Sequence, residues 1–537
     1  MGILRNLFRQ FGPKSQPQQA SSPSELVRRA RDGLVSGNIA AAGLACEDCL
    51  ELDPDNADAL HLLGLVAHRM EDWPRAMALF RRSIERQPGN AEFLNNLGGL
   101  LSQMGRADEA AAEFGRALRI DPQLHSAREN LLFILPFLQD ATGAEIRAEH
   151  EAWARLHARA SRPADTPRAP PGARAERLRI GYVSADFREH AVSFFMEPVI
   201  AAHDRRRFEI FCYSNNRRED AVTARIRPAA DHWRAIADLD DAQAAAAIRA
   251  DGVDILVDLS GHLKGNRLPV FALKPAPLQM TYLGYLVTSG LGAMDYRITD
   301  AICDPPGMTE AHYTETLLRL PGCMWCYQPP ADAPAVSAAP AARAGKVTFG
   351  STNNPAKITA RMLQLWGRIL QQVPGSRLLV AGTPALGRER IVEALARGGI
   401  GAERIEFHDR VPRPQFLELH GRIDVLLDTF PYNGGTTLCD ALWMGVPPVC
   451  LIGDWMPARG AASLLRAVGL DGCAVRDEPA YEREAIRLAR DLAGTAALRA
   501  GMRDRLRASP LLDAARFTRE LEALYDEAWR RGPPLRG

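Results

Sequence analysis

The sequence has no run of about 18 apolar residues, so no segment is expected to cross a lipid bilayer. It also has no excess of charge of either sign, because 66 basic residues stand against 65 acidic ones and the formal net charge is +1. This balance gives no support for a nucleic-acid-binding surface. The basic, amphipathic N-terminus has neither the apolar core nor the cleavage site of a signal peptide, so residues 1–23 are predicted to form a disordered leader.

The sequence offers no pattern for a disulfide framework or a zinc site. Its 9 cysteines are an odd number scattered through a large chain, which favours a reducing compartment and a cytoplasmic location. Two C-x-x-C pairs occur, Cys46/Cys49 and Cys323/Cys326, but neither has a second pair or a histidine pair at zinc-binding spacing. We therefore expect ordinary core thiols and no metal site.

The front of the chain contains an internal repeat. Pro54, Pro88 and Pro122 recur at a spacing of about 34 residues, the period of tetratricopeptide repeats. Other pairs keep the same offset, namely Gly64 and Gly98, Ala76 and Ala110, and Phe80 and Phe114. Each repeat is predicted to be a helix pair in which the small residues permit close approach and the aromatic ring fills the remaining space. We expect an α-solenoid over residues 24–126 and a helical linker over residues 127–175.

The concave face of such a solenoid suits a peptide or a partner protein, although a packing role toward the rest of the chain is the alternative. Asn96 and Asn130 share one register of the repeat and are candidates for contacts with a peptide backbone. Two asparagines are few for a row of peptide-binding residues, so the sequence leaves both peptide binding and packing open.

From Leu178 onward, short apolar runs alternate with helical segments, which is typical of βαβ units and a parallel sheet. In a first half, residues 176–330, strands are expected at 178–184, 208–214, 255–259, 278–283 and 296–302. An Ala/Pro-rich linker at 331–345 follows, and then a second half, residues 346–537, with strands expected at 347–351, 377–381, 405–408, 424–428 and 446–451. The predicted fold class is an α-solenoid followed by two Rossmann-like, doubly wound α/β domains, with ligands at the carboxyl ends of the strands.

One stretch of the second half is a candidate anion site. Residues 427–447, L-D-T-F-P-Y-N-G-G-T-T-L-C-D-A-L-W-M-G-V-P, pass from a buried strand through a Pro/Gly turn into a helix at Thr436 and Thr437. The free N–H groups and the dipole of a helix N-terminus suit a phosphate, whereas plain helix capping is the alternative. Asp440, one turn further on, is placed to accept hydrogen bonds from ribose hydroxyls or to act only as an N-terminal charge.

Other strand ends add polar groups to the same region. The motif G-S-T-N-N-P-A-K at 350–357 places Asn354 and Lys357 after another strand. The ammonium group of Lys357 can contact a diphosphate that the turn at Thr436 also faces. In the first half, His190 follows the first strand, where it can orient or deprotonate a substrate hydroxyl or be purely structural. D-L-S-G-H at 258–262 and L-G-Y-L-V-T-S-G at 283–290 follow two further strands and bring Gly-rich backbone to that edge.

Together these motifs resemble the O-linked N-acetylglucosamine transferase family, including its plant SPINDLY relatives. The specific carriers are Y-V-S-A-D-F-R-E-H at 182–190, D-L-S-G-H at 258, K-P-A-P-L-Q at 274, M-D-Y-R-I-T-D at 294, N-N-P-A-K-I at 353 and the stretch at 427–447. The resemblance implies a GT-B glycosyltransferase that moves GlcNAc from UDP-GlcNAc to Ser or Thr of proteins. It further implies inversion at the anomeric carbon, no required metal and no cofactor beyond the UDP-sugar co-substrate.

The resemblance also implies roles for individual residues. His190, at the sugar and the acceptor, and Lys357, which would neutralise the leaving diphosphate, are the candidate catalytic residues. The implied nucleotide-sugar site comprises Asn354, Lys357, Leu283, Gly284, Gly435, Thr436, Thr437 and Asp440. In it, the threonines would bind phosphate, Asp440 the ribose, and Leu283 and Gly284 would lie beside the sugar.

The sequence departs from the family pattern at two places. Leu286 and Val287 replace a Pro-Gly pair, which is expected to change the loop at the sugar pocket, and Gly435 stands where animal members carry histidine. Three alternatives therefore stay open. They are a SPINDLY-like transferase with another donor sugar such as fucose, a transferase with a non-protein acceptor, and a catalytically inactive repeat scaffold.

Overall fold

The computed structural model describes residues 22–158 and 177–534, so most of the predicted leader and residues 159–175 of the predicted linker lie outside the described residues. Within the described ranges, no helix is both long and apolar enough to span a membrane. The chain divides into a repeat unit that ends at Ile134 and an α/β unit that begins at Leu135. Each unit is described by itself.

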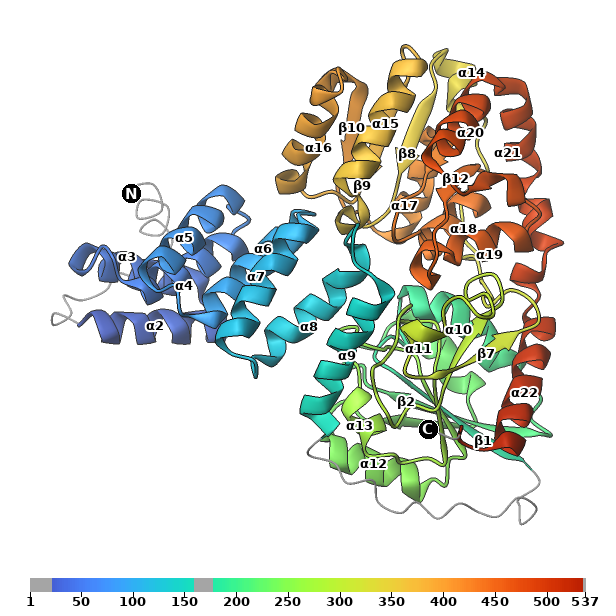
Figure 1. Cartoon of the computed structure of the whole chain (residues 1–537), viewed down its shortest axis with the longest axis horizontal. Helices are drawn as coiled ribbons and strands as arrows, with labels where there is room; N and C mark the ends of the chain where they lie inside the picture. Colours follow the sequence, from blue (N-terminus) through green and yellow to red (C-terminus); the bar gives the residue numbers. More distant parts are fainter. Residues whose placement is uncertain (1–21, 159–176, 535–537) are drawn as a thin grey trace. The chain divides into compact units, whose positions relative to one another are not determined.

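The repeat unit is a series of antiparallel helix pairs, drawn in blue in Figure 1. Its helices are α2 (Pro23–Ser36), α3 (Ile39–Leu52), α4 (Ala57–Arg69), α5 (Trp73–Arg86), α6 (Ala91–Gln103), α7 (Ala107–Ile120) and α8 (His125–Ile134). Polar residues cap the N-termini of several of these helices. The side-chain oxygens of Asn56 and Asp72, for example, accept hydrogen bonds from backbone N–H groups in the first turns of α4 and α5. The predicted α-solenoid is confirmed.

Close packing inside each pair explains the recurring glycine and phenylalanine. A Cβ atom at Gly64 would lie 2.7 Å from the ring of Phe80, and one at Gly98 would lie 2.6 Å from the ring of Phe114. Both rings are buried. Any larger residue would therefore displace the aromatic ring that fills each pair.

Asn96 and Asn130, which share one register of the repeat, have different hydrogen-bond partners. The side chain of Asn96 lies 2.9 Å from Nε2 of His61, whereas Asn130 donates to Oδ1 of Asn95 at 3.0 Å. Both bonds span 35 positions, so each joins successive repeats, but Asn96 and Asn130 do not share one type of partner.

The first half of the α/β unit is a seven-stranded parallel sheet in the order β3-β2-β1-β4-β5-β6-β7. Its strands are β1 (Leu178–Ser184), β2 (Phe208–Ser214), β3 (His232–Ala235), β4 (Ile255–Asp258), β5 (Leu278–Thr281), β6 (Tyr296–Asp300) and β7 (Thr316–Leu320). The second half is a six-stranded sheet in the order β10-β9-β8-β11-β12-β13. Its strands are β8 (Thr348–Ser351), β9 (Arg377–Ala381), β10 (Ile405–His408), β11 (Val425–Leu427), β12 (Pro448–Leu451) and β13 (Ala474–Val475).

Both sheets are doubly wound, as predicted, and helices cover their faces (Figure 1). The helices are α9 (Gly143–Ala158), α10 (Ala191–Ala202), α11 (Ala221–Ile226), α12 (Asp241–Ala250), α13 (Leu268–Ala272), α14 (Pro340–Ala344), α15 (Ala360–Gln372), α16 (Ala385–Arg397), α17 (Arg413–Leu419), α18 (Thr436–Trp443), α19 (Gly460–Ala467), α20 (Glu478–Arg490), α21 (Leu492–Arg507) and α22 (Ala514–Arg531). Strand order reverses between β1 and β4 in the first sheet and between β8 and β11 in the second. Ligands bind at such switch points, outside the carboxyl ends of the strands.

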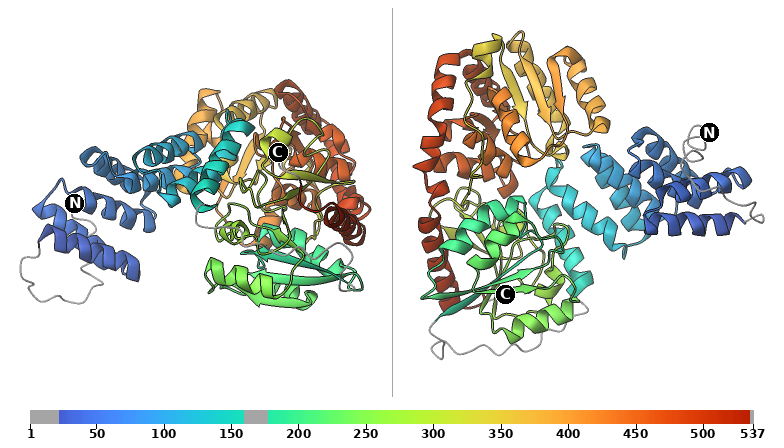
Figure 2. Two further views of the ribbon diagram at one scale, coloured as in Figure 1. Left: turned by 60° about the horizontal axis from the view of Figure 1, so that its bottom comes forward. Right: turned by 180° about the vertical axis from the view of Figure 1, so that it is seen from behind.

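The last helix, α22, runs from the second half back along the first, as Figures 1 and 2 show. There the buried Glu522 accepts hydrogen bonds from Nδ1 of His203 at 3.0 Å and from the backbone N–H of Asp204 at 2.8 Å. The hydroxyl of Tyr182 lies 2.8 Å from Nε2 of His203 and 3.1 Å from the hydroxyl of Tyr525. Sequence-based boundaries place α22 in the second half, but these polar contacts tie it to the first.

Candidate functional site

The turn between β11 and α18, residues 428–435, is organised by a buried carboxylate. Oδ1 of Asp428 accepts hydrogen bonds from the backbone N–H of Gly434 at 2.9 Å and from Nδ2 of Asn353 at 2.8 Å. Oδ1 of Asn353 in turn accepts from Oγ1 of Thr437 at 2.6 Å. These bonds connect the loops that follow β8 and β11, the two strands at the switch point of the second sheet.

Helix α18 begins without a side-chain cap, because its N-cap residue is Gly435. The hydroxyl of Thr437 is already used by Asn353, so the helix start presents backbone N–H groups of Gly435, Thr436 and Thr437. A Cβ at Gly434 would lie 2.6 Å from Oγ1 of Thr437 and 2.9 Å from Oδ1 of Asn353, so only glycine fits there. The arrangement is that of an anion-binding helix N-terminus.

Lys357 lies over the same turn. It ends the short 3-10 helix η4 (Pro355–Lys357), and its Nζ donates to the carbonyl of Asn433 at 3.1 Å and lies 4.0 Å from the ring centroid of Tyr432. Burial lowers the pKa of Lys357 to about 8, and the carboxylate of Asp428 opposes that shift. A bound anion would therefore find a partly desolvated cation beside the uncapped start of α18.

The neighbouring asparagines have different environments. Asn354 is exposed, and its Oδ1 accepts from the backbone N–H of Ala356 at 3.0 Å, which caps η4. The buried Asn353 makes the bonds to Asp428 and Thr437, a role that the sequence did not reveal. A contact between Asn354 and a nucleotide stays a prediction.

Asp440 lies where the two halves meet. Its Oδ1 accepts from the hydroxyl of Tyr327 at 2.5 Å and from Arg413 at 2.8 Å. The guanidinium group of Arg413 also lies 3.5 Å from the ring centroid of Phe194. Burial raises the pKa of Asp440, against the opposing effects of Arg413 and Tyr327. Both partners are new to the site, and binding of ribose by Asp440 stays a prediction.

His190 begins α10 in the first half. Its Nδ1 accepts from the backbone N–H of Val192 at 3.3 Å and lies 3.5 Å from Oδ2 of Asp186. Burial lowers the pKa of His190, an effect that the negative charge of Asp186 opposes, so the neutral ring is favoured. A neutral ring whose Nδ1 accepts carries its proton on Nε2, which makes Nε2–H a hydrogen-bond donor.

The loop after β5 packs directly on the loop after β4. A Cβ at Gly284 would lie 1.9 Å from the carbonyl oxygen of Leu259, so no other residue fits at this position. Leu283 adopts the left-handed region with φ of 68° and is buried. Leu286 and Val287, which replace a Pro-Gly pair of the family pattern, are buried as well. The loop is therefore a packed element of the first half.

Several contacts bring the carboxyl edges of the two sheets together. A Cβ at Gly435 would lie 3.9 Å from the ring of the buried Trp325, and Nε of Arg459 donates to the carbonyl of Ile302 at 2.7 Å. Lys357 and Thr437 share one cluster in the second half, whereas the hydrogen bonds of His190 stay within the first. The structure thus assembles two groups of predicted residues, one on each half.

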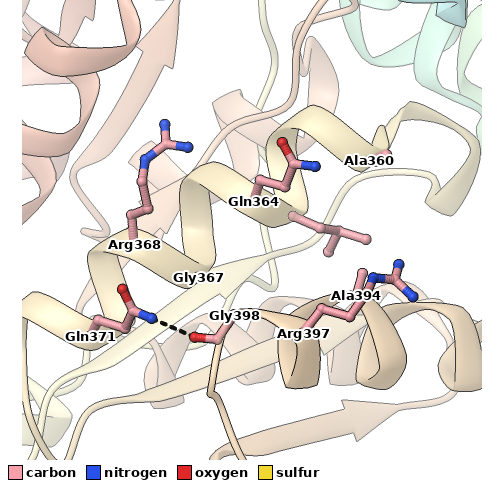
Figure 3. Close-up of a pocket in the computed structure, with 9 residues that line it drawn as sticks. Ala360, Gln364, Gly367, Arg368, Gln371, Ala394, Arg397 and Gly398 are labelled. Carbon is pink, nitrogen blue, oxygen red and sulfur yellow. Dashed lines mark hydrogen bonds between the residues drawn. The ribbon is translucent and has the colours of Figure 1, made fainter.

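A separate hollow of about 370 Å³ lies between α15 and α16 (Figure 3). Its lining comprises Ala360, Leu363, Gln364, Gly367, Arg368, Gln371, Ala394, Arg397 and Gly398. Arg368 pairs there with Glu478 and Glu482 of α20. None of the predicted site residues lines this hollow, so it is distinct from the candidate site.

Comparisons with known families match both parts of the chain. The model of glycosyl transferase family 41 matches residues 154–327 and 342–521. A tetratricopeptide repeat model matches residues 27–91 and 62–125.

Curated relatives cover the same region. The chain is 39% identical over 428 residues to a probable UDP-N-acetylglucosamine–peptide N-acetylglucosaminyltransferase, SPINDLY, of Solanum lycopersicum, which covers 77% of this chain and 45% of that protein. It is 33% identical over 365 residues to the similarly named SEC of Arabidopsis thaliana, covering 66% of this chain and 37% of that protein. The chain thus spans less than half the length of these relatives.

A solved structure is similar over nearly its whole length. A mutant of the O-GlcNAc transferase of Thermobaculum terrenum superposes with a TM-score of 0.84 at 39% identity, covering 96% of this chain and 99% of that one. The predicted order of a helical repeat region followed by two Rossmann-like halves is therefore shared with an experimental structure.

Proposed function

Because the chain belongs to glycosyl transferase family 41, we propose that it is an inverting glycosyltransferase that uses a UDP-sugar, with UDP-GlcNAc as the first donor. The proposed acceptors are Ser and Thr hydroxyls of proteins, in line with the printed names of its relatives. The family resemblance inferred from the motifs is thereby confirmed, whereas donor and acceptor belong to the proposal. The observation that carries it is Lys357 beside the uncapped start of α18.

The second half is proposed to hold the leaving group. A departing UDP gains negative charge on its diphosphate, and fixed dipoles and cations aimed at that charge lower the barrier. The N–H groups at Thr436 and Thr437 and the ammonium of Lys357 supply this environment without reorganisation. Asn354 and Asp440 are proposed to contact the nucleotide. Since the positive charge comes from the chain, we propose that no metal or further cofactor is required.

The first half is proposed to shape the sugar side. Leu283 and Gly284 would lie beside the sugar, where their packed backbone fixes the wall of the pocket. His190 would donate from Nε2 to the sugar or the acceptor, which makes it a positioning group more than a base. Inversion requires the acceptor hydroxyl to attack opposite the diphosphate, so the two halves would hold opposite ends of one reaction.

Acceptor recruitment and location complete the proposal. Tetratricopeptide helices offer a surface suited to a protein or peptide acceptor, and we propose that the repeat unit recruits it. All nine cysteines are free thiols, which supports a reducing, cytoplasmic location.

The test is a panel of nucleotide sugars incubated with the full chain and a protein lysate, followed by intact-mass measurement of the acceptors. An increment equal to N-acetylhexosamine is expected with UDP-GlcNAc. An increment with a different donor would reassign the sugar, in line with the altered Leu286 and Val287. Transfer to an isolated glycan and to no protein would show that the acceptor is a glycan and not a protein. No increment with any donor would refute the enzymatic proposal and leave the scaffold alternative.

A further inference from the structure

Helix α9, which precedes both sheets in the sequence, reaches the loop after β5 through one buried side chain. His150 is fully buried, with Nδ1 2.6 Å from the carbonyl oxygen of Ile146 and Nε2 2.9 Å from the hydroxyl of Tyr285. Tyr285 directly follows Gly284 in the loop at 283–290. A residue 135 positions away thus contacts the predicted sugar-side loop.

The direction of these hydrogen bonds is fixed by chemistry. A carbonyl oxygen only accepts, so Nδ1 of His150 carries the proton. Burial lowers the pKa of His150 to about 4, which keeps the ring neutral near pH 7. Nε2 is then an acceptor, and the hydroxyl of Tyr285 must donate to it. A protonated ring would instead donate from Nε2 to the hydroxyl oxygen of Tyr285, which reverses the direction of this bond.

The same cluster also holds the far end of the loop. His262 packs edge-on against His150, with ring centroids 4.7 Å apart, and its Nε2 donates to the carbonyl of Ser289 at 2.8 Å. A Cβ at Gly290 would lie 2.4 Å from the backbone of His150, so the last residue of the loop touches α9 itself. Tyr285 and Ser289 are therefore held by one group of rings.

Polar groups of the first half hold the loop from its other side. The buried Arg297 donates to the carbonyls of Tyr285 at 2.9 Å and of Val287 at 2.8 Å. The buried Glu315 accepts from the backbone N–H of Ser289 at 2.7 Å and from the hydroxyl of Thr288 at 2.7 Å. Helix α9 contributes His150 to this frame from outside residues 258–315, which makes His150 a remote part of it.

We propose that His150 is a positioning residue that, through the hydroxyl of Tyr285, fixes the backbone of Leu283 and Gly284 against the donor sugar. Leu283 has a φ of 68°, a conformation that a leucine keeps only when its surroundings impose it. This inference rests on the proposed function, because it takes the loop at 283–290 to line the sugar. It predicts that the cluster tunes affinity for the sugar part of the donor and leaves affinity for the UDP part unchanged.

The test compares calorimetric affinities of the full chain for UDP and for UDP-GlcNAc. Tyr285→Phe keeps the ring and removes the donated proton, so affinity for UDP-GlcNAc should fall about tenfold, with UDP binding unchanged. His150→Leu should produce the same selective loss, and the double variant should lose no more than either single one. His150→Gln, whose amide oxygen can accept from Tyr285, should recover part of the loss.

Tyr213→Phe is the matched control, since it removes a hydroxyl bonded to Asp251 from a buried tyrosine ring on β2, which is not adjacent to β5 in the sheet. It should leave both affinities unchanged. Equal loss for UDP and UDP-GlcNAc in the Tyr285 and His150 variants, or no loss in either, would overturn the positioning role. If one of these variants fails to fold, the UDP and UDP-GlcNAc affinities of the His150→Gln variant decide whether the positioning role holds. A wild-type chain that binds neither ligand would refute the proposed function itself, and this inference with it.

Discussion

In the first half of the α/β unit, the loops that follow β4 and β5 are closed by bonds between protein groups. Asp258 accepts from the backbone N–H groups of Ser260 and Gly261, and the loop at 283–290 is framed on two sides. In the second half, the loop after β11 ends at Gly435, where α18 starts without a side-chain cap and a lysine with a lowered pKa lies above it. The same doubly wound topology therefore supplies hydrogen-bonded, packed loops in the first half. In the second half it supplies a positively charged site made of uncapped helix N–H groups and Lys357.

This difference separates shape from charge. Substitutions in the first half should act through geometry and depend on the sugar, whereas those in the second half should act through charge and depend on the diphosphate. The following predictions test that division, from the largest expected effect to the smallest.

Lys357→Met should have the largest effect, because it removes the cation that we propose to face the leaving diphosphate. We expect kcat/KM for transfer to fall about 10³-fold, as measured with the donor identified in the panel. The exposed Lys346→Met of the same half is the matched control and should leave transfer unchanged. If Lys357→Met retained turnover, the positive charge of Lys357 would not be what the second half contributes to the reaction.

Gly284→Ala should have the next largest effect, and it acts only through shape. The added Cβ would lie 1.9 Å from the carbonyl oxygen of Leu259, so the loop must move. We expect transfer to fall about 10²-fold, because a displaced pocket wall misplaces the sugar. UDP affinity by calorimetry should stay within error, and Gly472→Ala, which meets nothing within 4 Å, is the control. An equal loss of UDP affinity would contradict the division between halves.

The pH dependence of UDP binding should be intermediate in size. Burial depresses the pKa of Lys357 from 10.5 to about 8, so the free protein loses this cation as the pH rises through 8. UDP affinity should therefore weaken about tenfold per pH unit above 8, a dependence that Lys357→Met abolishes. For folding the sign is opposite. The unfolded chain binds more protons between pH 8 and 10.5, so the contribution of Lys357 to the unfolding free energy rises across that window.

Thr437→Val should have the smallest effect of the four. It removes the hydrogen bond to Asn353, at a cost of about 1 kcal/mol, and loosens the turn that presents the N–H groups. UDP affinity should fall about fivefold by calorimetry. Thr495→Val removes a similar buried hydroxyl bond within the C-terminal helices and should lower stability alone. An unchanged UDP affinity in Thr437→Val would show that the start of α18 does not depend on Asn353.

Local sequence patterns predicted the fold better than they predicted the site. The bounds of β1, β2, β9 and β10 agree with the predicted strands. Strands β1, β2 and β9 are largely buried and mostly apolar, whereas β10 is only half-buried. Strand β3, with the sequence H-W-R-A, lies at an edge and is mostly exposed, so it has no apolar alternation to find. Strand β13 has only two residues, which is too short for any periodic signal.

The site partners that sequence reasoning missed are distant in the chain or ambiguous between neighbours. Tyr327 lies 113 positions from Asp440, and no local pattern encodes such a pairing. Asn353 and Asn354 are adjacent and chemically identical, so only the backbone conformation decides which side chain turns inward. Family resemblance identified the motifs, but the bonds within them required coordinates.

Helix α22 has a consequence for how the chain is made. A ribosome releases His203 319 positions before Glu522, its buried carboxylate partner, and Tyr182 343 positions before Tyr525. Until α22 emerges, these polar groups of the first half lack the partners that satisfy them in the folded protein, and burying them unsatisfied would cost about 1–3 kcal/mol each. We therefore expect the first half to reach its native packing only after α22 has been made, so the first half would become functional together with the second.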